Sequence, residues 1–270
     1  MKYMTLPNER RIAIIDKYSA KDVYEEIFED EPYQREGLRV QPGDVVLDIG
    51  GNIGLWSMYI LENVPDIRLI TVEPVPQIFA ALQENLQTCQ PPEASVTVLN
   101  VGLAEQERTT QFNFYPRLAA DSTANPFDFD QQAETFLGMM NKGITRFVPR
   151  GLKAWGVRRL LGWMYKPEIV TCQLKTLSQI IAEYQLDHID FLKLDAENAE
   201  REVLAGIADD DWPKIKQIAM EAHTTAPEGK TVVEDLTALL ESKGFTVAVD
   251  RESRFSAIGV HMMYAKRPSA

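Results

Sequence analysis

The chain has 270 residues, of which 45% are hydrophobic, and a formal net charge of −12 at pH 7. This composition can bury a substantial core and excludes a disordered or fibrous protein. The negative charge argues against nucleic acid as the main partner, because the phosphate backbone would be repelled. A membrane-spanning helix would need a run of about 18 apolar residues, and the sequence has none. We therefore expect a soluble, cytoplasmic protein without a signal peptide or a transmembrane segment.

The first part of the chain alternates short apolar runs with segments of helical spacing. Val45 to Gly50 is an apolar run that ends in a glycine turn, which is typical of a strand buried on both faces of a parallel sheet. Gly54 to Asn63 has helical spacing and Arg68 to Glu73 is the next strand, so the three form a β-α-β unit. Pro76 to Leu86 predicts a second helix, and Ser95 to Leu103 a third strand.

The same alternation returns near the C-terminus. In chain order we predict strand Ile189 to Asp195, helix Ala199 to Ile207, strand Ile215 to His223, helix Thr231 to Lys243, and strands Phe245 to Asp250 and Gly259 to Ala265. The last two strands should form a hairpin, which gives the sheet an antiparallel edge. The predicted fold is an α/β, Rossmann-like, mostly parallel seven-stranded sheet with helices on both faces, an antiparallel C-terminal edge hairpin and a lid-type insertion.

Two segments fall outside this alternation. Residues 1–43 precede the first sheet strand, and we expect their part from Tyr18 to Leu38, rich in Glu and Asp, to cap the open end of the sheet. Residues 115–168 interrupt the main domain, residues 44–270, with a stretch too long for a plain connection. We therefore predict that residues 115–168 form a lid or a substrate-recognition insert.

The second half of this insert, residues 142–166, contains no acidic residue. Its cations include Arg146, Arg150, Lys153, Arg158, Arg159 and Lys166, and its apolar residues Trp155, Leu160, Leu161, Trp163 and Met164 suit an amphipathic helix. Three interpretations remain open. The helix is a plain lid, a docking face for an acidic carrier protein or a phosphorylated substrate, or a helix that lies on an anionic membrane surface.

The segment VLDIGGNIG at residues 46–54 indicates the cofactor. Its glycines let the backbone turn tightly and approach a ligand at the carboxyl edge of the sheet. A dinucleotide fingerprint that starts at Gly50 would need glycines where Asn52 and Leu55 stand, and the lysine of a P-loop is absent. Asp48 precedes the turn, and a carboxylate there suits a cofactor with an ammonium and a sulfonium group rather than a pyrophosphate.

Glu73 ends the second strand, where its carboxylate could accept hydrogen bonds from both ribose hydroxyls of an adenosine. A solvated carboxylate at a strand end is the alternative. Asn100, Val101 and Gly102 end the third strand and are expected beside the adenine, unless they form an ordinary turn. The predicted cofactor-binding residues are Asp48, Gly50, Gly51, Asn52, Gly54, Glu73, Pro74, Asn100, Val101, Gly102 and Asp195.

Four segments resemble the FkbM-type S-adenosylmethionine-dependent O-methyltransferases. They are VVLDIGGNIGLWS (residues 45–57), VEP (72–74), IDFLKLDAENAEREVLAGI (189–207) and MEAH (220–223). The family usually has D-x-E-G-x-E at residues 195–200, where Asn198 replaces the glycine here, and it more often has alanine where Gly51 stands. Asparagine tolerates left-handed backbone angles better than most residues, so we expect the same turn.

The resemblance covers roughly residues 44–223. It implies S-adenosyl-L-methionine as the cofactor and transfer of a methyl group to a hydroxyl of a small-molecule, natural-product or glycan substrate, which could be tethered to a carrier protein. Two other functions remain open. One is N-methylation, in which a neutral amine needs less help from a base, and the other is a non-catalytic module that binds an adenosine compound.

Asp195, Glu221 and His223 lie at predicted strand ends and are the candidate catalytic residues. An alcohol must lose its proton near the transition state, and the imidazole of His223 titrates closest to neutral pH, so we expect His223 to be the general base. Alternatively, Asp195, Glu197, Glu221 and His223 form an oxygen-rich site for a divalent cation such as Mg²⁺, which is the less favoured hypothesis. Glu197 and Glu200 could instead cap the following helix.

Overall fold

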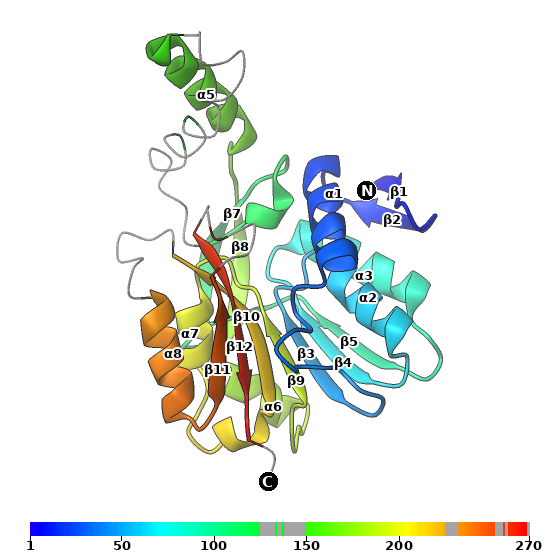
Figure 1. Cartoon of the computed structure of the whole chain (residues 1–270). Coiled ribbons are helices and arrows are strands. Elements are labelled where there is room, and N and C mark those ends of the chain that lie inside the picture. Colours follow the sequence, from blue (N-terminus) through cyan, green and yellow to red (C-terminus); the bar gives the residue numbers. More distant parts are fainter. Residues whose placement is uncertain are drawn as a thin grey trace.

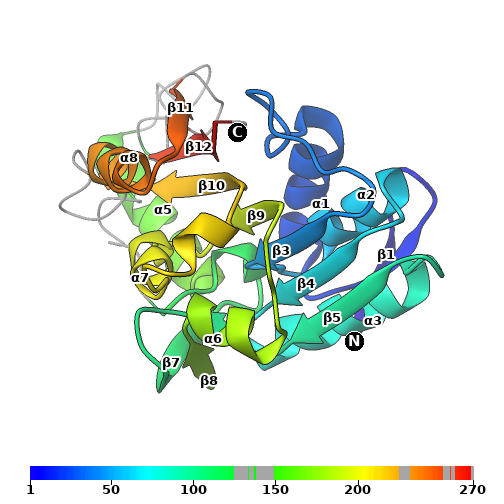
Figure 2. The ribbon, with the colours of Figure 1, turned by 90° about the horizontal axis from the view of Figure 1, so that it is seen from below.

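The computed structural model of the chain describes residues 1–124, 133, 137, 149–224, 232–251, 256 and 259–268. Its centre is a seven-stranded sheet with the strand order β11-β12-β10-β9-β3-β4-β5 (Figures 1 and 2). The strands are β3 (Val45–Ile49), β4 (Arg68–Val72), β5 (Ser95–Leu99), β9 (Phe191–Leu194), β10 (Gln217–His223), β11 (Thr246–Asp250) and β12 (Val260–Lys266). β12 pairs antiparallel with β10 and β11, while the other pairs are parallel. The predicted mostly parallel sheet with a C-terminal hairpin is confirmed.

Helices cover both faces of this sheet, as Figure 2 shows. They are α2 (Leu55–Asn63) and α3 (Pro76–Cys89) on one face, and α6 (Leu177–Glu183), α7 (Glu200–Ala205) and α8 (Val232–Ser242) on the other. Successive side chains of a strand point to opposite faces. Val46 therefore joins the core under α2 and α3, while Leu47 joins the core under α6, α7 and α8. Burial on both faces explains the nearly continuous apolar runs in the sequence.

The order of the strands creates a crevice at one edge of the sheet. From β3 the chain moves outward to β4 on one side, and it later returns as β9 on the other side of β3. The connections that follow β3 and β9 diverge at this point, so a crevice opens beyond the carboxyl ends of the two strands. This crevice is where an open α/β sheet binds its ligand.

The N-terminal segment packs beside this crevice. It contains a two-stranded sheet of β1 (Lys2–Thr5) and β2 (Arg11–Ile14), the helix α1 (Lys17–Glu25) and a π-helical turn η1 (Glu26–Asp30). The buried side chain of Asn85 on α3 holds the N-terminal segment in place. The amide nitrogen of Asn85 donates to the carbonyls of Ala13 and Ile53, and its amide oxygen accepts from Ala13 N. Asn85 thus joins β2 to the turn that follows β3.

A second sheet has the strand order β6-β8-β7, with β6 (Gly102–Leu103), β7 (Arg108–Phe114) and β8 (Glu168–Lys175). The single strand expected over residues 95–103 is therefore wrong. β5 ends at Leu99, and the side chain of Asn100 donates to the carbonyls of Glu73 and Pro74 as the chain turns toward β8.

The predicted insert lies between two paired strands. Phe114, the last residue of β7, pairs with Glu168, the first residue of β8. Within the insert the structure describes a 3-10 turn, η2 (Ala119–Asp121), and the helix α5 (Arg150–Met164), which projects away from the central sheet (Figure 1). Arg146 lies outside the described residues.

Another 3-10 turn, η4 (Trp212–Lys214), precedes β10. Among the helices that the structure describes, each is too short or too polar to cross a bilayer.

The Asn85 contacts predict a measurable loss of stability. Replacing Asn85 by Ala removes three hydrogen bonds of 2.7 to 3.0 Å and leaves buried backbone groups without a partner. We expect the free energy of unfolding to fall by about 2 to 4 kcal/mol, measured by urea denaturation. Asn63→Ala is the matched control, because this exposed asparagine donates to one carbonyl only and its loss should cost below about 0.5 kcal/mol. Equal losses in both variants would contradict the assignment.

Candidate active site

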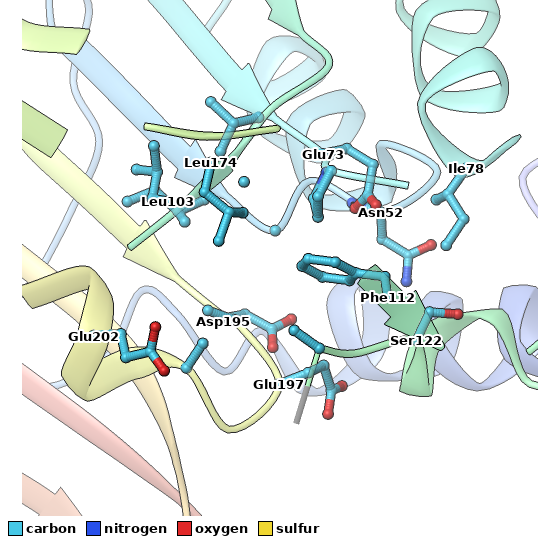
Figure 3. A pocket seen from close by; sticks show the side chains of 18 of the residues that line it. Asn52, Glu73, Ile78, Leu103, Phe112, Ser122, Leu174, Asp195, Glu197 and Glu202 are labelled. Carbon is cyan, nitrogen blue, oxygen red and sulfur yellow. The ribbon is translucent and has the colours of Figure 1, made fainter. Parts of the chain in front are cut away.

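A cleft lies beyond the carboxyl ends of β3, β4 and β9 and has an empty volume of about 750 Å³, part of it open to solvent. Its lining includes six of the predicted cofactor-binding residues, namely Gly50, Asn52, Glu73, Pro74, Gly102 and Asp195. Figure 3 shows Asn52 and Glu73 on one side of the cleft, with Asp195 and Glu197 on the other.

The turn after β3 depends on glycine. Gly50 has φ +76°, and a Cβ on it would lie 1.7 Å from the carbonyl oxygen of Asp195, so no other residue fits. A Cβ on Gly51 would lie 2.2 Å from Oγ1 of Thr71. The Thr71 hydroxyl therefore occupies the space that the alanine common in FkbM-type sequences would need.

Glu73 presents a buried carboxylate to the cleft. Its Oε1 accepts from Val75 N at 2.9 Å, and its Oε2 accepts from Asn52 N at 3.2 Å. Each carboxylate oxygen has a further lone pair, which leaves acceptor capacity for a ligand. Burial raises the pKa of the Glu73 carboxyl to about 7, while the two N–H groups work in the opposite direction.

Asp48, predicted to bind the cofactor, does not line the cleft. Its carboxylate is fully buried below the turn, where it accepts from Ser57 Oγ at 2.6 Å and lies 3.1 Å from Lys193 Nζ. These contacts occupy the carboxylate and make it part of the scaffold. Gly51, Gly54, Asn100 and Val101 are likewise outside the lining of the cleft, although they form or support its turns.

Lys193 is a site residue that our sequence analysis missed. Its ammonium donates to the carbonyl of Gly50 at 3.0 Å and lies 3.6 Å from Oδ2 of Asp195. Burial opposes its charge, but Asp48, Asp195 and Glu221 outweigh that effect and raise the pKa of Lys193 above its usual value. A single lysine within an otherwise apolar strand, FLKL, is the sequence signal that could have revealed it.

His223 is buried and has a carboxylate beside each ring nitrogen. Its Nδ1 lies 2.8 Å from Oε1 of Glu200, and its Nε2 lies 3.5 Å from Oε2 of Glu197. Burial opposes protonation of the ring, but these carboxylates outweigh it and raise the pKa of His223 well above its usual value. Glu200 therefore does more than begin α7, because it orients His223.

His223 lies beside two residues that line the cleft, Asp195 and Glu197. Ligand atoms of the three side chains lie within 4.8 Å of one another, and we call this group the Asp195–Glu197–His223 cluster. Asp195 and Glu197 line the cleft, whereas His223 does not. Burial and the charge of Glu221 raise the pKa of Asp195 to about 7, although the charges of Lys193 and His223 lower it.

Glu221, the third candidate catalytic residue, faces the N-terminal segment. It accepts a hydrogen bond from the hydroxyl of Tyr33, and Glu26 of η1 lies close enough to hydrogen-bond with it. Burial raises the pKa of Glu26 well above its usual value, and the charge of Glu221 adds to that rise. The N-terminal segment thus contributes a carboxyl group, that of Glu26, and a phenol, that of Tyr33, next to Glu221.

The turn between β9 and α7 contains two left-handed residues, Glu197 at φ +43° and Asn198 at φ +70°. The prediction that Asn198 adopts the left-handed conformation usual for glycine there is confirmed. Because a left-handed Glu is strained, the turn stores free energy at a point where it places Glu197 beside His223.

The roof of the cleft comes from segments that our sequence analysis did not assign to the site. Phe112 of β7 and Ser122 of the insert face the cleft in Figure 3. Arg108 of β7 forms an ion pair with Glu202 of α7 at the rim. These residues come from the smaller sheet, which the alternation of strands and helices did not predict.

Three features place the protein in a class, the Rossmann-like methyltransferases. They are the strand order, the glycine turn at the point where the strand order reverses, and the acidic residue directly after β4, Glu73. The Methyltransferase FkbM domain matches residues 48–247, which is most of the chain. The chain belongs to the FkbM methyltransferase family, and it is a transferase that uses S-adenosylmethionine.

Two relatives show how this family member compares in length. The 31-O-demethyl-FK506 methyltransferase FkbM of Streptomyces tacrolimicus is 31% identical over 98% of this chain and 96% of its own length. The AMB antimetabolite synthetase AmbE of Pseudomonas aeruginosa is 33% identical over 97% of this chain, which spans only 12% of that synthetase.

A solved structure supports the fold. The FkbM methyltransferase of Methylobacillus flagellatus KT has a TM-score of 0.51 and 16% identity, and the match covers 90% of this chain and 47% of that one. The chain therefore spans about half of that protein.

The titration of Glu73 predicts how S-adenosylmethionine binding depends on pH. The folded protein holds the Glu73 proton up to about pH 7, and ribose hydroxyls donate best to the ionised carboxylate. Cofactor affinity, measured by calorimetry between pH 5.5 and 8.5 (roughly the range around that pKa), should therefore rise with pH and level off above about 7. Glu73→Gln should weaken binding by about 1 to 3 kcal/mol above pH 7 and remove this rise.

A comparison of Asp48→Asn with Glu73→Gln distinguishes a residue that supports the turn from a residue that binds the cofactor. Because Asp48→Asn leaves Lys193 with one charged partner fewer, it should lower the free energy of unfolding as well as cofactor affinity. Glu73→Gln should lower affinity more than stability, because the neutral amide removes the cost of burying a charge, although its NH₂ group cannot accept the hydrogen bond from Asn52 N or Val75 N that the replaced oxygen accepts. Unchanged affinity in Glu73→Gln would exclude the ribose assignment.

Proposed function

We propose that this protein transfers the methyl group of S-adenosylmethionine to a hydroxyl of a small-molecule, natural-product or glycan acceptor. The observation that supports O-methylation is the position of the Asp195–Glu197–His223 cluster, which faces Glu73 across the cleft. An alcohol needs groups of this kind, because its proton must leave near the transition state. The name of the Streptomyces tacrolimicus relative also specifies an O-demethyl substrate.

In the proposed reaction the acceptor oxygen attacks the methyl carbon in line with the carbon–sulfur bond. That bond breaks, S-adenosylhomocysteine leaves, and the hydroxyl proton is taken up by the Asp195–Glu197–His223 cluster. Glu73 and the turn at Gly50 bind the cofactor, and Asp195 lines the cleft on the acceptor side. His223, which the sequence suggests as the general base, acts as part of this cluster, since Glu197, which lines the cleft, lies beside its ring.

Variants of the cluster should separate turnover from cofactor binding. We expect Asp195→Asn and His223→Ala each to reduce turnover at least about 100-fold, with S-adenosylmethionine affinity changed less than about threefold. His188→Ala is the control, because this half-exposed histidine pairs with Asp190 away from the cleft. The measurement is a screen of acceptors with labelled cofactor, followed by mass spectrometry of the methylated atom.

The same screen tests the other functions. A product methylated on nitrogen, with turnover that survives His223→Ala, would favour an N-methyltransferase. Cofactor binding without any methyl transfer to a cognate acceptor would favour a module that binds an adenosine compound.

We also propose that the insert, residues 115–168, recognises the acceptor and that α5 docks an acidic carrier protein that holds it. Four large apolar side chains on α5 are 55% to 62% exposed, and the helix contains cations but no carboxylate. They are Leu152, Trp155, Leu160 and Trp163. Val157 and Leu161, on the opposite side of the helix, pack against Ala133 and Leu137 instead. The exposed face thus offers aromatic anchors within a basic surface, which suits an acidic partner.

The length of one relative supports this partner. The chain corresponds to a small part of the AmbE synthetase, so a domain of this family occurs within a much larger synthetase. We further propose that residues 1–43 cap the acceptor side, supported by the contact of Tyr33 with Glu221.

Charge reversal on α5 should weaken association with an acidic carrier. Arg159 lies next to the exposed Trp155, and Arg159→Glu is expected to slow association with the carrier at least about tenfold at low salt. The association rate of the unchanged protein should fall as the salt concentration rises. Lys17→Glu, an equal change of charge on α1, should have little effect. Kinetics in a surface-binding assay would measure both. Association that is insensitive to salt would favour a plain lid, and binding to anionic vesicles alone would favour a membrane-surface helix.

A further inference from the structure

We propose that Asp195, Glu197 and His223 bind one divalent cation at the acceptor side of the cofactor cleft. This inference depends on the proposed function only for the role of the ion in catalysis. Its binding test needs neither cofactor nor acceptor, so the two proposals can fail separately.

The geometry of the cluster suits one ion. The three ligand atoms lie within 4.8 Å of one another, and Nε2 of His223 lies 3.5 Å from Oε2 of Glu197. Small rotations of the side chains would bring each atom to the distance of about 2.1 Å at which Mg²⁺ binds oxygen. Two carboxylates and one imidazole form a mixed oxygen and nitrogen set, which suits Mn²⁺ as well as Mg²⁺.

A buried carboxylate fixes the orientation of His223, as expected around a metal ligand. Glu200 is 3% exposed, and its Oε1 lies 2.8 Å from Nδ1 of His223 and accepts from Asn198 N at 3.2 Å. When Nδ1–H donates to Glu200, the ring is held with the lone pair of Nε2 directed toward Glu197. Histidine ligands of metals commonly donate their second ring nitrogen to a carboxylate in this way.

One oxygen of Asp195 is available to a ligand, although the side chain as a whole is 24% exposed. Its Oδ1 is buried and has no hydrogen-bond partner among the described residues, while its Oδ2 lies 3.6 Å from Lys193. A buried carboxylate oxygen without a partner is costly, so such an atom calls for an explanation. A cation bound at Oδ1 would satisfy this oxygen and offset the repulsion between Asp195 and Glu197.

The position of the cluster gives the ion a role in methyl transfer. Asp195 and Glu197 line the cleft opposite Glu73, so an ion held by them would lie beside the proposed acceptor (Figure 3). The ion would lower the pKa of an acceptor hydroxyl beside it, and a carboxylate oxygen of the cluster would take up the hydroxyl proton and release it to water. The resulting oxyanion takes the methyl group as the carbon–sulfur bond breaks. His223 then serves as a ligand rather than as the proton acceptor.

The test measures Mn²⁺ binding to the full chain after removal of metal by a chelator, using the electron paramagnetic resonance signal of free Mn²⁺. We expect one equivalent to bind, and Asp195→Asn and His223→Ala each to weaken binding at least about tenfold. Glu200 is a positioning residue, so Glu200→Gln should weaken binding by about 10- to 100-fold without removing a ligand.

Glu221→Gln is the matched control for negative charge. Glu221 is a neighbouring carboxylate outside the cluster whose charge acts on Asp195, so its variant should weaken Mn²⁺ binding, but by well below the roughly tenfold loss expected for Asp195→Asn and His223→Ala if these residues are the ligands. Melting temperature and S-adenosylmethionine affinity of each variant establish that it is folded. A natural chain that binds no Mn²⁺, or Mn²⁺ affinity unaffected by Asp195→Asn and His223→Ala, would overturn the site. Absence of cofactor binding would instead overturn the proposed function.

Discussion

The active site depends on the ammonium group of Lys193. It is buried between the carboxylates of Asp48 and Asp195 and donates to the carbonyl of Gly50, so one charge joins β3, the glycine turn and β9. Its Nζ also lies 5.1 Å from the centre of the Tyr33 ring, which brings the N-terminal segment to the same point. A charge withdrawn from water this far persists only when it is paired, so these elements must assemble together. The shape of the cofactor cleft follows from this assembly.

Much of the fold, and part of the lining of the cleft, could be predicted because their signals are local. Apolar runs that end in glycine mark parallel strands, and the spacing between Gly50 and Glu73 follows from one β-α-β unit. Gly50 and Glu73 belong to that unit, and both line the cleft. Asn198 was also predictable, since left-handed geometry leaves a signature in the residue types that tolerate it.

The remaining features depend on contacts between residues far apart in the chain. Asp48 has the position of a cofactor ligand in the sequence, but Lys193, 145 positions later, occupies its carboxylate. The partner of His223 is Glu200 on α7, which precedes β10 in the chain, although Glu221 is closer in sequence. The smaller sheet was missed because β7 and β8 pair across a long insert, and β6, the strand before β7 in the sequence, is two residues long and pairs with β8. Pairing of this kind is decided by tertiary structure rather than by periodicity.

The chain leaves the smaller sheet at Phe114 and re-enters it at Glu168, and these two residues face each other across the ladder. An insert whose two ends are neighbours can change in length and sequence without moving the strands that support it. The reason is that closing a longer loop adds little to the entropic cost of folding. Ala119, Ser122 and Ala124 still contact the cofactor cleft, so this freedom begins only beyond them. If the insert recognises the acceptor, as we propose, exchanging its outer part between homologous proteins would alter acceptor choice without changing the strands that carry the cluster.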